Sequence, residues 1–97
     1  MNSIFDTIGK IRSDIRMSKT TNSFGDEHTL NLVSAVSDYL DEIEDYLTSR
    51  NLTKEKLDAF SFGIFRLVTD DSQLEKSSLG QDLLNFRAML RELGKKL

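Results

Sequence analysis

A row of carboxylates is the most distinctive chemical feature of this sequence. Asp38, Asp41, Glu42 and Asp45 are spaced i, i+3, i+4 and i+7, so a helix would place them side by side on one face. Like charges at this spacing repel each other, and residues 20–49 hold seven acids and no Lys or Arg to neutralise them. Such a row is suited to binding the Arg and Lys side chains of a partner.

The alternative interpretation of this row is the solvated outer face of an amphipathic helix. Basic residues of a neighbouring helix would then supply the opposite charge. Arg87, Arg91 and Lys95 share one stripe of the last predicted helix and are the candidates for that role. The two interpretations differ in whether the carboxylates stay available to a partner.

Two aromatic residues extend the candidate partner-binding surface. Tyr46 flanks the apolar side of the acidic segment. Phe62 falls outside the apolar stripe of its own segment, among Asp58, Arg66 and Thr69. An exposed Phe at that position would anchor a partner or a homodimer. Alternatively, its helix lies centrally in a bundle and buries Phe62 on a second side.

His28 is the only histidine of the chain and lies near the start of a predicted helix. Together with Leu30 it resembles the His-x-Leu-Lys-Gly pattern of histidine phosphotransfer domains, which are four-helix bundles of similar size. The resemblance implies that His28 accepts a phosphoryl group. It covers these two positions alone, because Asn31 stands where the family has Lys and Leu32 where it has Gly. The alternative is a polar residue in the first turn of a helix.

Most other reactive sites lack the residues that they need. There is no Cys, which excludes thiolate nucleophiles, disulfides and cysteine-based zinc sites. A single His excludes the two Glu-x-x-His motifs of a di-iron bundle. The sequence also has no Gly-rich phosphate loop and no calcium loop. We therefore expect a protein that is not an enzyme and that holds no metal or cofactor.

Apolar spacing predicts four helices that position these residues, over 3–17, 26–49, 54–70 and 78–94. Apolar side chains recur every three or four positions in each range, and in the last the spacing alternates as in a heptad seam. The stripes consist of Ile4, Ile8, Ile11 and Ile15 in the first helix, Val33, Val36, Leu40, Ile43 and Leu47 in the second, Leu57, Phe60, Ile64, Phe65, Leu67 and Val68 in the third, and Leu79, Leu83, Phe86, Leu90, Leu93 and Leu97 in the fourth.

Short local signals mark the connections between these helices. Asn51 is expected to adopt a left-handed conformation after the second helix, and Thr53 to cap the third. Ser72 and Ser78 each open a capping-box pattern, so the fourth helix has two possible starts. Gly63 lies in mid-helix, where the absence of a side chain would permit a close helix contact.

Composition and connection length together indicate the fold class. The chain has 97 residues, of which 38% are hydrophobic and 30% charged, as expected for one globular domain. Four amphipathic helices with short connections predict an all-α, antiparallel up-down-up-down four-helix bundle spanning residues 1–97.

The charge balance disfavours nucleic acids and membranes as partners. The formal net charge is −3, and the basic residues Lys10, Arg12, Arg16 and Lys19 do not interleave with aromatic residues. No apolar run reaches the length of a membrane span. A small chain without Cys is more typical of the cytoplasm than of a secreted protein, so we expect a cytoplasmic location.

The function that these features favour is binding to another protein. We expect a small inhibitor of the immunity, antitoxin or anti-defence type, whose acidic second helix blocks a basic surface of a toxin or nuclease-like partner. Phosphotransfer through His28 and a self-associating structural module are the two alternatives.

Overall fold

The computed structural model describes residues 4–21 and 27–97, and it is helical. No strand occurs in the described part of the chain, which confirms the all-α prediction. The structure has four long helices and one short one, in the order α1 (Ile4–Thr21), α2 (Glu27–Thr48), α3 (Lys54–Thr69), α4 (Ser72–Lys76) and α5 (Ser78–Lys95).

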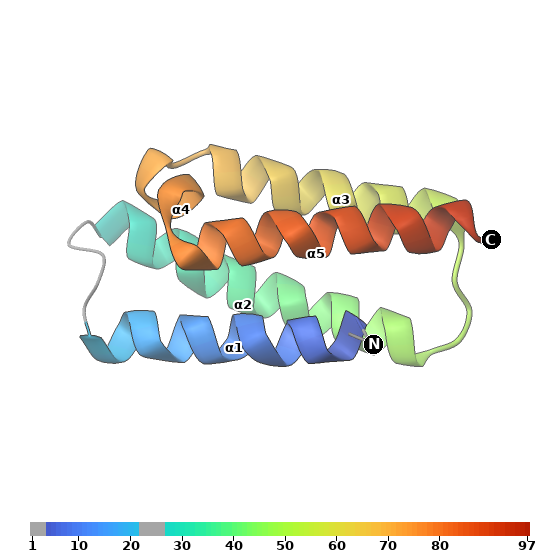
Figure 1. Ribbon diagram of the computed structural model, residues 1–97, viewed down its shortest axis with the longest axis horizontal. Helices are drawn as coiled ribbons and strands as arrows, with labels where there is room; N and C mark the ends of the chain where they lie inside the picture. The colour runs from blue at the N-terminus through green and yellow to red at the C-terminus, as the bar shows by residue number, and fades with distance from the viewer. Residues whose placement is uncertain (1–3, 22–26) are drawn as a thin grey trace.

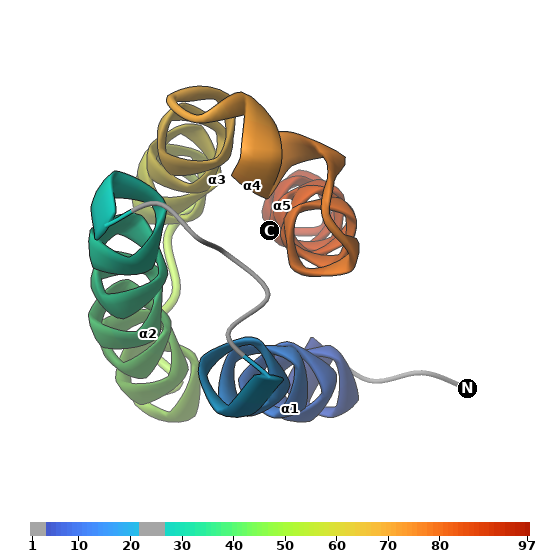
Figure 2. The ribbon, with the colours of Figure 1, turned by 90° about the vertical axis from the view of Figure 1, so that its left-hand side faces the viewer.

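Successive long helices run in opposite directions, as Figure 1 shows. Helix α5 packs against α3 on one side and against α1 on the other. Helix α2 is strongly tilted: it begins beside α3 and ends beside α1 (Figures 1 and 2). The regular four-helix bundle that the sequence predicts is therefore not confirmed in detail, because α2 crosses its neighbours and α4 adds a fifth helix.

The apolar stripes of the long helices form the core, because each stripe faces the inside of the molecule. The stripe of α2 is buried along its whole length, from Val33 to Leu47. Buried apolar residues of the core are Ile8, Ile11, Ile15, Val33, Val36, Leu40, Ile43, Leu47, Leu57, Phe60, Ile64, Val68, Leu74, Leu79, Leu83, Phe86 and Leu90.

Three residues of the predicted stripes, Ile4, Leu67 and Leu93, are partly buried against this core, and two others are exposed. Leu97 is exposed, because α5 ends before it. Phe65 was expected to widen the stripe of α3, and that prediction is wrong: its ring is exposed and packs under the guanidinium of Arg87, 4.8 Å away. Ser61 is buried in α3 instead, and its hydroxyl donates to the backbone carbonyl of Arg87 at 3.4 Å. The inward face of α3 is thus rotated away from Phe65.

The helix boundaries follow the local signals with small shifts. The predicted starts at residues 3 and 26 lie outside the described residues. Helix α1 continues through Thr21, past the predicted end at residue 17, because no Pro or Gly interrupts residues 18–21. Thr53 caps α3 as predicted, and its hydroxyl accepts from the backbone N–H of Lys56 at 3.3 Å. The left-handed residue before it is Arg50, with φ of 61°, and not Asn51.

Both predicted starts of the fourth helix are used, one for each of two helices. Helix α4 begins at Ser72, but its cap is Asp71, whose carboxylate accepts from the backbone N–H groups of Gln73 and Leu74. Helix α5 begins at Ser78, but its cap is Ser77, whose hydroxyl accepts from the N–H of Gly80. Each cap thus lies one residue before the predicted one.

Candidate interaction surface

The four carboxylates of the predicted acidic row are exposed on α2. Asp38, Asp41, Glu42 and Asp45 share the side of α2 opposite its buried apolar stripe. The helical period places them there, because the residues that alternate with them are held in the core. This row of Asp38, Asp41, Glu42 and Asp45 is called the acidic ridge below.

One basic residue neutralises part of the acidic ridge, and it comes from α1. The guanidinium of Arg12 donates to the Asp41 carboxylate at 2.6 Å and to the Glu44 carboxylate at 2.8 Å. The hydrogen bond to Asp41 is the main cause that raises the pKa of Arg12 above its ordinary value. No ion pair within the described residues joins Asp38, Glu42 or Asp45.

The alternative interpretation, in which α5 neutralises the ridge, has no support among the described residues: no ion pair joins Arg87, Arg91 or Lys95 to the acidic ridge. The main packing partners of α5 are α3, α1 and α4. Arg87 lies over the ring of Phe65, and Lys95 pairs with Glu92 of its own helix at 3.5 Å. Most of the acidic ridge therefore keeps its negative charge facing solvent.

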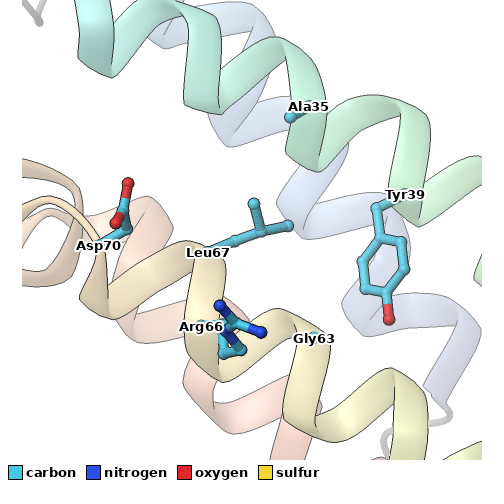
Figure 3. A pocket seen from close by; sticks show the side chains of 6 residues that line it. All are labelled: Ala35, Tyr39, Gly63, Arg66, Leu67 and Asp70. Carbon is cyan, nitrogen blue, oxygen red and sulfur yellow. The ribbon is translucent and has the colours of Figure 1, made fainter.

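A groove lies between α2 and α3 beside the acidic ridge (Figure 3). It has a volume of about 510 Å³ and is a shallow depression that is widely open to solvent. Residues of both helices line the groove, and more of the lining surface is apolar than polar. The lining residues are Ala35, Tyr39, Gly63, Arg66, Leu67 and Asp70.

Gly63 lets Tyr39 enter this groove, as the close contact predicted for Gly63 requires. A Cβ atom at position 63 would overlap the Tyr39 hydroxyl and lie 2.7 Å from Cζ of its ring. The ring packs edge to face on Phe60, with centroids 5.5 Å apart. Burial raises the pKa of Tyr39, and the nearby negative charge of Glu42 raises it further. The acidic ridge therefore borders the groove at Tyr39.

Phe62 is exposed, so the interpretation that buries it inside a bundle is wrong, and its role as an anchor for a partner stays a prediction. Solvent reaches 61% of the surface of this residue, so no neighbouring helix buries Phe62 on a second side of α3. The guanidinium of Arg66 lies 5.9 Å from its ring centroid. Since Arg66 also lines the groove, its guanidinium lies between the groove and the exposed ring of Phe62.

Tyr46 has a structural role at the connection between α2 and α3. Its hydroxyl accepts from the backbone N–H of Thr53 at 2.6 Å. Its ring packs against Phe60, with centroids 5.4 Å apart, and the ammonium group of Lys56 lies 5.9 Å from it. The structure therefore turns Tyr46 toward α3, away from the ridge with which the sequence grouped it.

His28 lies at the opposite end of α2, near the end of α3. Its side chain is 60% exposed, and its Nε2 atom lies 3.4 Å from a carboxylate oxygen of Asp70. Negative charge beside this nitrogen opposes the approach of an anionic phosphoryl group. The neighbouring Thr29 is buried and donates to Asp71 at 2.6 Å, which is the main cause that lowers the pKa of Asp71.

A pair of acids between α1 and α5 is absent from the sequence-based candidates. Asp82 is buried, and one of its carboxylate oxygens lies 3.3 Å from the ammonium nitrogen of Lys10 in an ion pair. One carboxylate oxygen of Asp14 and one of Asp82 are buried without a hydrogen-bond partner. Burial raises the pKa of Asp14 to about 6, together with the neighbouring Asp82 carboxyl, which acts first by hydrogen bonding to the protonated form and then by its charge. Asp14 directly precedes Ile15 and Asp82 directly precedes Leu83, so each acid flanks an apolar stripe. This position next to a core residue is the feature of the sequence that could have pointed to the pair.

Comparisons with protein-family models, with curated proteins and with solved structures find no match for this chain. Among the described residues, no group of three or more potential ligands is placed to hold a metal ion. The helices described here are too short or too polar to cross a lipid bilayer. The function is therefore argued from the surface itself.

Proposed function

We propose that this chain is a non-enzymatic binding module that covers a basic surface of another protein with the acidic ridge of α2. It would act as a small inhibitor of the immunity, antitoxin or anti-defence type. The observation that carries the proposal is the exposure of Asp38, Glu42 and Asp45 on one helix face, without an ion pair to the described residues.

Electrostatics gives the physical reason for a basic partner. The carboxylates of the ridge repel each other in the free protein, by roughly 0.2–0.5 kcal/mol for each close pair. Arg and Lys side chains of a partner would replace this repulsion by charge-assisted hydrogen bonds. A cluster of one sign also accelerates the encounter with a partner of opposite charge.

Charge reversal of the three unpaired acids tests the proposal. The triple variant Asp38→Lys, Glu42→Lys and Asp45→Lys leaves the Arg12–Asp41 ion pair intact. The wild type, used as bait in a lysate of the source organism, is expected to capture a basic protein that the triple variant loses. Capture is measured by mass spectrometry of the bound fraction, and the partner's affinity is then measured with purified proteins.

A matched variant separates the position of the charges from their number. Glu55, Asp58 and Glu92 are exposed acids of α3 and α5, outside the ridge. Their reversal to Lys changes the net charge by the same amount, and it is expected to leave capture intact. Equal capture by the ridge variant and the wild type would refute the proposal, as would the absence of any basic protein among the captured ones.

A further inference from the structure

We propose that the partner's contact segment is a basic helix that inserts one large apolar side chain into the groove between α2 and α3. This inference rests on the proposed function and adds the kind of segment that the acidic ridge recognises. The juxtaposition that carries it is an apolar groove with a negatively charged border on α2 and an exposed Phe on α3.

The groove itself provides the site for an apolar anchor. Its apolar walls are Ala35 and the Tyr39 ring of α2 and Leu67 of α3, and the charged side chains of Arg66 and Asp70 complete the lining on α3 (Figure 3). A volume of about 510 Å³ is large enough to hold a Leu or an aromatic side chain. Helical partners commonly bind by laying such anchors into a groove between two helices.

An exposed aromatic side chain lies close to the groove on α3. Phe62 lies outside the groove and is 61% exposed, and Arg66 connects it to the groove wall. An exposed aromatic side chain next to a concave apolar site is typical of the centre of a protein interface. A helix laid along the groove would cover both features at once.

Charge selects a basic segment over a second copy of this chain. Asp38 and Glu42 are one turn apart on α2, and Glu42 is close enough to influence Tyr39 in the groove. Lys or Arg residues one turn apart on a partner helix would meet these two carboxylates. A second copy would bring a second acidic ridge to the same border, and like charges across an interface oppose association.

Two synthetic helical peptides test this inference. Both carry Lys residues one turn apart along one face, and they differ only in a central Leu or Ala. We expect the Leu peptide to bind at least about tenfold more tightly than the Ala peptide, since a buried Leu contributes that much. In an NMR titration of the ¹⁵N-labelled protein, the Leu-dependent shifts are expected at Ala35, Tyr39 and Gly63.

A pair of Trp variants ties the effect to the groove. Ala35 is exposed and lines the groove, so Ala35→Trp fills the groove without disturbing the core. It is expected to remove the difference between the two peptides. Asn85 is exposed on α5 and does not line the groove, so Asn85→Trp is expected to preserve the difference. Circular dichroism confirms that both variants remain folded.

Each contrary outcome has a separate meaning. Equal binding of both peptides at the acidic ridge would overturn the groove inference and leave the proposed function supported. Binding of neither peptide would overturn the groove inference, and the lysate capture would still decide the proposed function. Concentration-dependent dimerisation that Ala35→Trp abolishes, measured by sedimentation, would assign the groove to a second copy and overturn the inference.

Discussion

At the scale of single residues, the Asp14–Asp82 pair is the least expected feature of the molecule. Two carboxylates meet between α1 and α5, and each has a buried oxygen without a hydrogen-bond partner. Lys10 offsets the charge of Asp82 at 3.3 Å, and it also counteracts the upward shift of the Asp14 pKa. The ionised form of Asp14 is therefore destabilised in the folded state.

The Asp14 pKa of about 6, above its ordinary value of 3.8, predicts how stability depends on pH. Between about pH 4 and 6 the folded state holds the Asp14 proton more firmly than the unfolded state does, so this residue makes the free energy of unfolding fall as pH rises. Asp14→Asn removes the ionisation and is expected to raise that free energy by about 1–2 kcal/mol at neutral pH, and less at pH 4. Urea titrations across this pH range measure the difference.

An exposed residue that does not ionise provides the control for this prediction. Ser13 is exposed on α1 beside Asp14 in the sequence, and Ser13→Ala is expected to leave the pH dependence between pH 4 and 6 unchanged. A stability curve of Asp14→Asn parallel to that of the wild type would show that Asp14 ionises normally in the folded protein.

At the scale of helices, the junction between α4 and α5 is closely packed around Gly80. Gly80 is buried in the first turn of α5. A Cβ atom there would overlap the backbone carbonyl oxygen of Leu74 and lie 2.9 Å from its carbonyl carbon. Because backbone cannot move aside as a flexible side chain does, this position requires glycine for space and not for an unusual φ.

Two glycine substitutions in helices are therefore expected to change stability in opposite directions. Gly80→Ala is expected to lower the free energy of unfolding by about 2 kcal/mol or more, because α4 must shift away from α5. Gly9 lies in α1, where a Cβ atom would meet nothing within 4 Å, so Gly9→Ala is expected to raise it by about 0.5–1 kcal/mol. Thermal and urea unfolding measure both changes, and a destabilised Gly9→Ala or an unchanged Gly80→Ala would contradict the packing described here.

At the scale of the whole molecule, negative charge is concentrated on α2 although the net charge is only −3. The tilt of α2 leaves the outer face of this helix away from α5 and its basic stripe (Figures 1 and 2). Arg12 of α1 pairs with the carboxylates of Asp41 and Glu44 on α2. These two ion pairs link the fold to the charge of the proposed binding surface.

Removal of Arg12 is expected to weaken the fold slightly and to strengthen binding. Arg12→Ala loses two partly exposed ion pairs, so the free energy of unfolding is expected to fall by about 0.5–1 kcal/mol. The Lys-bearing Leu peptide is expected to bind more tightly, and the gain is expected to shrink between about 0.05 M and about 0.5 M salt. Titration calorimetry measures the affinity. Arg91 is an exposed residue of α5, and Arg91→Ala is the control. An equal gain in affinity in that variant would exclude a local effect at the acidic ridge.

The sequence alone is sufficient to derive the helices and the inward face of most of them. A helix is a local structure, so the period of Val33, Val36 and Leu40 marks its buried side wherever the helix is placed. The same period locates the acidic ridge, since the ridge lies opposite that stripe. Caps such as Thr53 are equally local, because the side chain and the N–H it binds are three residues apart.

The contacts between helices depend on how each one is tilted and rotated, which local periodicity does not encode. For this reason Arg12 and not Arg87 meets the ridge, and Phe65 lies outside the core while Ser61 lies inside. The meeting of Asp14 with Asp82 has the same origin. The tertiary structure alone places the groove beside the ridge, because its walls come from two helices that cross at an angle.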